Sequence, residues 1–124
     1  MLVYGFTISS SLVTILHFLF AYRQIITWRT PAGLKALGIA PNSEKPFKVL
    51  ALQQGVYNIF LALGLGISLL SSNSPISYWG AMFFLSCMTI AGIIGGLTAI
   101  RAILFAIPAG SACALILLFL KNQY

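Results

Sequence analysis

The sequence predicts an all-α integral membrane protein, a bundle of four transmembrane helices that forms a single domain over residues 1–124. Of the 124 residues, 60% are hydrophobic and only 6% are charged, and the mean hydropathy is +1.00. Charged residues make up about 25% of an ordinary soluble domain. A chain with so few charges cannot cover its surface for water, so we expect its surroundings to be lipid.

Four long apolar runs are the predicted membrane spans, over residues 2–26, 49–70, 77–100 and 102–120. A helical crossing takes roughly 20 residues, and each run reaches about that length. The runs must be helical because a bilayer offers no water to satisfy exposed backbone groups. The first run has no cation before it and continues past the usual length of a signal-peptide core, so it is interpreted as a retained helix.

The distribution of cations predicts the orientation. Six of the seven lysines and arginines lie on one side of the predicted spans, in or beside residues 27–48 or at Arg101. The positive-inside rule makes that side cytoplasmic, so both termini are predicted to be extracytoplasmic in a cell membrane. Interfacial aromatic residues agree, with Trp28 and Phe47 on the inner side and Tyr4, Tyr78, Trp79 and Tyr124 on the outer side.

The predicted cytoplasmic loop, residues 27–48, has a helix signal of its own. Thr30 can cap a helix whose first residue is Pro31, and Gly38 can end it. We expect this short helix to lie at the membrane interface, with Leu34 and Leu37 toward the lipid and Lys35 toward the headgroups.

Polar and small residues recur on one face of the first two spans. Polar side chains inside a bilayer cost free energy unless they face protein or a cavity. In the first span, intervals of three and four residues place one set on a single helical face: Thr7, Ser10, Thr14, His17, Ala21, Gln24 and Trp28. In the second span the corresponding face is formed by Ala51, Gln54, Gly55, Asn58, Ala62 and Gly66, with Gln53 and Tyr57 on its flanks.

The candidate ligand-binding residues come from these two faces: His17, Gln24, Gln54, Tyr57 and Asn58. Amide side chains can orient the neutral polar head group of a ligand through hydrogen bonds, but they transfer protons poorly. Histidine is the one side chain among them that can serve as acid, base, donor or acceptor near neutral pH. The structural alternative is a buried, neutral His17 that is hydrogen-bonded to Gln54 or Asn58 and only joins two helices.

No metal, cofactor or nucleic-acid partner is expected. Cys87 and Cys113 lack CxxC spacing, His17 has no second ligand in the membrane, and the cations flank the apolar runs. Gly92 and Gly96 form a GxxxG pair that favours close helix packing. That packing is expected within one chain or in a homodimer, and membrane lipids are the other expected partners.

The stretch from Gln53 to Gly64 reads QQGVYNIFLALG. On this stretch the sequence resembles a family of small integral membrane proteins known as domain of unknown function thirteen-oh-four. The resemblance extends to His17, Trp28-Arg-Thr-Pro-Ala-Gly, Ala91-Gly-Ile-Ile-Gly and Pro108-Ala. It implies four helices and a membrane location and supplies no activity. In the family pattern an acidic residue occupies the position of Gln24 and an asparagine that of Gln53, so this chain lacks a membrane carboxylate that could carry a proton.

Several functions are compatible with these features. The preferred hypothesis is a protein that binds or transports a small amphiphile or lipid in a polar pocket between the first two spans. One alternative is a structural or accessory membrane subunit without a ligand. Another is an intramembrane enzyme that uses His17 as acid or base on an isoprenoid- or sterol-like substrate. A small multidrug exporter is disfavoured, because such exporters use a glutamate in the first helix and Glu44, the only acid, lies in the loop.

Overall fold

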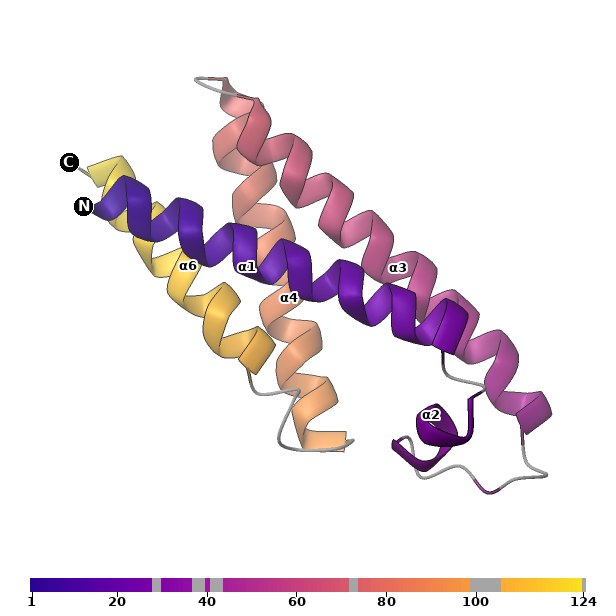
Figure 1. Cartoon of the computed structure of the whole chain (residues 1–124). Helices are drawn as coiled ribbons and strands as arrows, with labels where there is room; N and C mark the ends of the chain where they lie inside the picture. Colours follow the sequence, from indigo (N-terminus) through magenta and orange to yellow (C-terminus); the bar gives the residue numbers. More distant parts are fainter. Residues whose placement is uncertain (28–29, 37–39, 41–43, 72–73, 99–105, 124) are drawn as a thin grey trace.

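The regular structure of this chain is helical throughout its described part (Figure 1). The computed structural model describes residues 1–27, 30–36, 40, 44–71, 74–98 and 106–123. The elements are α1 (Leu2–Tyr22), its π-helical continuation η1 (Arg23–Thr27), α2 (Pro31–Ala36), α3 (Glu44–Leu70), α4 (Pro75–Thr98) and α6 (Ala106–Gln123). The predicted all-α class is confirmed.

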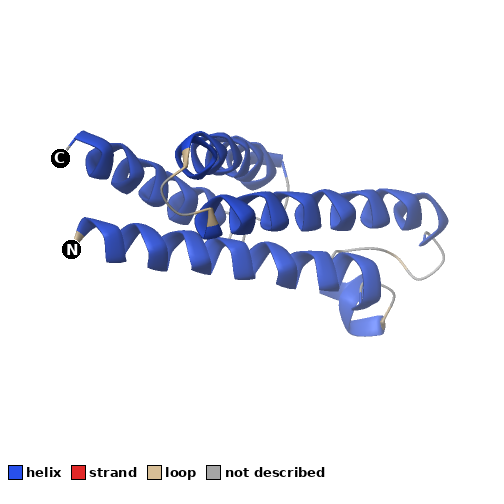
Figure 2. Ribbon diagram, turned by 90° about the horizontal axis from the view of Figure 1, so that it is seen from above, coloured by secondary structure: helices blue, strands red, loops and turns tan. Residues whose placement is uncertain are grey.

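The four long helices pack in a ring. α1 packs against α3 and α6, and α4 packs against the same two helices. Both termini and the turn between α3 and α4 lie at one end of the molecule, which we call the terminal end, and α2 lies at the opposite end, the α2 end (Figure 1). α4 is steeply inclined to α1 and α3, so it is seen nearly end-on when those two helices run along the page (Figure 2).

The core lies between the four helices and is made of apolar side chains of different sizes: Phe6, Val13, Leu65, Ala81, Leu85, Met88, Ala114 and Leu118. α3 and α4 approach closely beside their connecting turn. There the aromatic ring of Phe84 occupies the space where a side chain at Gly64 would stand, and the Ser68 side chain does the same at Gly80. The two glycines therefore fix how near α3 and α4 come at the terminal end.

Three described helices are long and apolar enough to cross a membrane: Leu2–Thr27, Lys48–Leu70 and Pro75–Gly95. A fourth apolar stretch, Pro108–Asn122 in α6, is shorter. The outer surface carries large apolar side chains such as Ile8 and Leu12, which are 60% and 58% exposed. Extended apolar surface of this kind is typical of a protein that lies in lipid.

The helix boundaries differ from the predicted spans at several points. α3 begins at Glu44, inside the predicted loop. α4 begins at Pro75, because the backbone N–H of Ser77 donates to Ser74 Oγ at 3.3 Å and proline suits the first helical position. Residues 99–105, which contain the end of the third predicted span, Arg101 and the start of the fourth, lie outside the described residues.

The predicted cap of α2 is confirmed. The backbone N–H of Gly33 donates to Thr30 Oγ1 at 3.1 Å, and Pro31 is the first helical residue. The expectation that Leu34 faces lipid is wrong, since this side chain is only 8% exposed. Leu34 is the one large apolar side chain of the helix and packs inward, while Lys35 stays exposed. The other residues of these predictions lie outside the described residues: Trp28, Arg29, Leu37, Gly38 and Tyr124.

Candidate functional site

His17 lies on the buried face of α1, together with Phe6, Ser10, Val13 and Ala21. Its side chain is 3% exposed, and Nδ1 is 2.9 Å from the carbonyl oxygen of Val13. Because a carbonyl oxygen only accepts hydrogen bonds, Nδ1 carries the proton in this contact and Nε2 of the neutral ring holds a lone pair. The hypothesis of a His17 hydrogen bond to Gln54 or Asn58 is wrong.

The residue that reaches those two amides is Gln24, about two helical turns further along the chain. Asn58 Nδ2 donates to Gln24 Oε1 at 2.7 Å, and Gln24 Nε2 donates to Gln54 Oε1 at 3.3 Å. The three side chains, which we call the amide cluster, thus join η1 to α3. Asn58 and Gln24 are half-buried and Gln54 is exposed, so the cluster runs from the helix contact to the surface.

The amide cluster retains hydrogen-bonding capacity. Within the described part of the chain, Gln54 Nε2 and Asn58 Oδ1 have no partner. Exchanging the oxygen and nitrogen positions of all three side-chain amides would reverse the direction of both hydrogen bonds. One donor and one acceptor would still remain unpaired at the ends of the cluster. The cluster can therefore both donate to and accept from a further group.

The π-helical segment η1 carries Gln24 and is the feature that sequence periodicity missed. A π-helix bonds i to i+5, is rare, and occurs frequently at functional sites. In η1 the Thr27 hydroxyl also donates to the carbonyl oxygen of Arg23 at 3.3 Å. No residue pattern in Arg23–Thr27 signals this geometry, because the three-and-four spacing of the first span reads as continuous α-helix.

Gly55 allows α1 and η1 to meet α3 beside the amide cluster. A methyl group at Gly55 would overlap Cγ1 of Ile25 and lie 3.4 Å from the carbonyl oxygen of Ala21. Gly55 is buried, and it precedes Asn58 by one helical turn. The close approach of the two helices at this glycine is what lets short amide side chains span the seam.

An apolar groove lies along the same seam. Its volume is about 290 Å³, and it is lined by Phe18, Ala21, Tyr22, Ile25, Ile26 and Ile59. None of the five predicted ligand-binding residues lines this groove. Two residues of the lining, Ile25 and Ile59, are however the sequence neighbours of Gln24 and Asn58.

The five predicted residues are thus divided among three places. Gln24, Gln54 and Asn58 are brought together, whereas His17 is buried in α1 away from them. Tyr57 is 62% exposed and has no hydrogen bond within the described residues. Their role in ligand binding stays a prediction, as does an acid–base role of His17.

The described residues hold no group of three or more histidine, cysteine, aspartate or glutamate side chains that could bind a metal. Both cysteines are free, with Cys87 half-buried and Cys113 exposed. Neither is part of the amide cluster.

The described part of the chain is all-helical, and its apolar helices of membrane-crossing length are typical of a membrane protein. The family model described as protein of unknown function (DUF1304) matches residues 11–119, so the chain belongs to this family. The resemblance carried by QQGVYNIFLALG is thereby confirmed. Neither a curated protein nor a solved structure matches the chain.

Proposed function

We propose that this chain is a multi-pass membrane protein in which α1, α3, α4 and α6 all cross the membrane. α6 has 18 residues, which at 1.5 Å per residue gives about 27 Å, close to the hydrocarbon thickness of about 30 Å. The ring packing supports this, because α6 lies against two helices that are long and apolar enough to cross.

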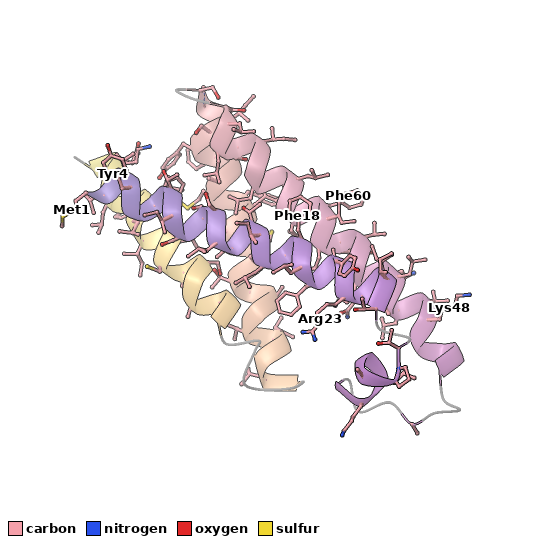
Figure 3. The ribbon with its side chains drawn as sticks, viewed as in Figure 1. Met1, Tyr4, Phe18, Arg23, Lys48 and Phe60 are labelled. Carbon is pink, nitrogen blue, oxygen red and sulfur yellow. The ribbon has the colours of Figure 1, made fainter. Side chains whose placement is uncertain are left out.

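The lysines and arginines that the structure describes support an orientation with the α2 end in the cytoplasm. Arg23 and Lys48 lie at that end, opposite Met1 and Tyr4 (Figure 3), and Lys35 belongs to α2. Cations are enriched on the cytoplasmic side of membrane proteins. We therefore place the protein in the cell membrane with both termini extracytoplasmic.

Within this arrangement we propose that the protein binds or carries a small amphiphile or lipid with a neutral, hydrogen-bonding head. The observation that supports this function is the amide cluster, whose ends offer one donor on Gln54 and one acceptor on Asn58. A hydroxyl or amide head would satisfy both groups at once. Polar groups inside a membrane are costly unless they have such partners.

The neighbouring groove supports an amphiphile rather than a wholly polar ligand. Its lining is apolar and includes Ile25 and Ile59, which adjoin the amide cluster in sequence. An amphiphile can lay its chain in the groove and place its head at the cluster. The groove volume of about 290 Å³ holds part of such a chain, and the rest would lie in the surrounding lipid.

A structural or accessory subunit is the second candidate, and one observation favours it. Gln24 bonds to both Gln54 and Asn58 without any ligand, so the cluster can serve as a link between helices. Such interhelical hydrogen bonds contribute about 0.6 kcal/mol each on average in membranes.

Native mass spectrometry of the protein, extracted gently from its own membrane, separates the two candidates. The variant Asn58→Ala removes the free acceptor of the cluster. The matched control is Gln53→Ala, because Gln53 is an exposed amide on the same helix and has no hydrogen bond within the described residues.

For a binding protein we expect a discrete added mass in the wild type and in Gln53→Ala, and its loss in Asn58→Ala. A wild type without added mass, together with a less stable Asn58→Ala, would support the accessory-subunit function. Retention of the same added mass by Asn58→Ala would show that the ligand lies elsewhere.

A further inference from the structure

A second cavity lies at the terminal end of the molecule, opposite the amide cluster. Its volume is about 150 Å³, and three helices meet around it. We call it the terminal pocket. It is lined by Phe6 of α1, by Leu118, Lys121 and Asn122 of α6, by Ser77 and Tyr78 of α4, and by Ser74 just before α4.

The terminal pocket has an apolar base and a polar rim. Phe6 and Leu118 are 7% and 4% exposed and form the base, whereas Lys121 and Asn122 are exposed. Lys121 Nζ lies 5.7 Å from the centroid of the Phe6 ring, within the range of a cation–π contact. This contact holds the ammonium group at the pocket.

Lys121 has no carboxylate beside it in the described part of the chain. The sequence contains a single acidic side chain, Glu44, and that residue begins α3 at the opposite end of the molecule. Because no acidic group among the described residues neutralises Lys121, its ammonium group gives the terminal pocket a positive field.

Hydroxyl donors complete the rim. Ser74 is already used, because its hydroxyl donates to the carbonyl oxygen of Ser71 at 3.1 Å and accepts from the Ser77 N–H at 3.3 Å. The side-chain hydroxyls of Ser77 and Tyr78 have no hydrogen-bond partner within the described residues. They lie in the first turn of α4, where the helix dipole also favours negative charge.

We propose that the terminal pocket binds a phosphate-type oxyanion through Lys121 and the hydroxyls of Ser77 and Tyr78. The apolar base formed by Phe6 and Leu118 favours the head of an anionic phospholipid, whose chains can continue along the helices. Free phosphate is the other source of the same chemistry. The terminal pocket is separate from the amide cluster, and oxyanion binding in it requires no ligand at that cluster.

Trp79 provides the reporter for a test. It is 67% exposed, and its ring packs edge-on against Tyr78, with the centroids 5.2 Å apart. The chain has two tryptophans, so Trp28→Phe leaves Trp79 as the only one. The full chain with this substitution is placed in phosphatidylcholine vesicles, and the quenching of Trp79 by brominated phosphatidylglycerol is compared with that by brominated phosphatidylcholine.

We expect brominated phosphatidylglycerol to reach half-maximal quenching at a mole fraction roughly five-fold lower than brominated phosphatidylcholine, since one lysine near an anionic lipid surface gives an effect of about that size. Lys121→Gln and Ser77→Ala should reduce this preference, while Lys121→Arg and Lys48→Gln should retain it. Lys48 is the control because it lies at the opposite end (Figure 3).

Inorganic phosphate distinguishes the two sources. If it reverses the lipid quenching only partly and at high concentration, the lipid head is the ligand. If it changes Trp79 emission in pure phosphatidylcholine and no lipid preference exists, free phosphate is the ligand. The thermal unfolding midpoint of each variant in detergent shows whether it is folded.

Two results would overturn the proposal. One is a wild type with neither a lipid preference nor a response to phosphate. The other is a preference that Lys121→Gln removes and Ser77→Ala leaves unchanged, because Lys121 would then act only as a surface charge without a pocket.

Discussion

Gly92 of α4 lies directly against Pro108 of α6. A methyl group at Gly92 would stand 2.7 Å from Pro108 Cδ and 3.1 Å from the Pro108 nitrogen, and both residues are buried. Pro108 is the third residue of α6, where its missing N–H is not needed for an intrahelical bond. The first glycine of the predicted GxxxG pair therefore serves helix packing within this chain. The surroundings of the second, Gly96, are outside the described part of the structure.

We expect Gly92→Ala to lower the free energy of unfolding by about 1–3 kcal/mol, because the added methyl group meets the rigid proline ring and overpacks the contact. Gly66→Ala is the matched control. Nothing lies within 4 Å of a methyl group at Gly66, so this change should raise the stability by up to about 1 kcal/mol through helix propensity. Unfolding of both variants in detergent with increasing denaturant measures the difference, and equal effects would contradict the close packing.

Ser10 should be replaceable by alanine with a gain in stability. Its hydroxyl is fully buried and has no hydrogen-bond partner among the residues that the structure describes. The Thr14 hydroxyl, by contrast, donates to the carbonyl oxygen four residues earlier in the same helix. An unsatisfied buried hydroxyl costs about 1–3 kcal/mol, so Ser10→Ala is expected to raise the free energy of unfolding by that order. Ser111→Ala should lower it, since Ser111 Oγ lies 2.8 Å from Thr89 Oγ1. A destabilised Ser10→Ala would show that this hydroxyl has a partner in the membrane.

A double-mutant cycle between Gln24→Ala and Asn58→Ala should give a coupling energy of about 0.6 kcal/mol, and no more than about 1.7 kcal/mol, as measured for other interhelical hydrogen bonds in membranes. The physical reason is the 2.7 Å bond from Asn58 Nδ2 to Gln24 Oε1. The same cycle between Gln24→Ala and Gln53→Ala should give no coupling, because Gln53 has no bond to Gln24. Coupling of similar size in both cycles would mean that the substitutions act through the helices as a whole.

The neutral His17 ring is expected to carry its proton on Nδ1. The Val13 carbonyl oxygen, 2.9 Å away, accepts a hydrogen bond and cannot donate one. The ¹⁵N chemical shifts of the ring in labelled protein distinguish the two tautomers, with a protonated signal from Nδ1 and an unprotonated signal from Nε2. A proton on Nε2 would contradict the Val13 contact and would require an acceptor on the other side of the ring.

The helices and their exposed apolar sides could be predicted because they follow from hydrophobic periodicity. The spacing of the first span predicts an outer face formed by Ile8, Leu12, Ile15, Leu16 and Leu19. All of these are exposed except Leu16, which is half-buried. Periodicity did not predict that the buried side of α3 changes direction between the two ends of the helix. Gly66 was expected on that face but has open space around it, while Ser68 is 2% exposed. The reason is that α3 packs against α1 at one end and against α4 at the other, and a single stripe cannot describe two partners.

The candidate site could be predicted only as a set of residues on two faces. Gln24, Gln54 and Asn58 were correctly placed near the seam between the first two spans. Which of them would bond was set by η1, because its i to i+5 turn changes the register in which Gln24 meets α3. The position of His17 on the buried face of α1 was likewise predictable. Its hydrogen bond to the Val13 carbonyl oxygen depends on the side-chain rotamer, which sequence spacing does not specify.

The contact between Gly64 and Phe84 has a consequence for the evolution of this family. The Phe84 ring fills the volume in which any side chain at position 64 would stand, so the two positions share one space in a closely packed interior. Natural relatives with a larger residue at position 64 should carry a smaller one at position 84. The side-chain sizes at positions 64 and 84 would then be inversely correlated. An alignment of such relatives would show paired substitutions at these two positions rather than independent ones.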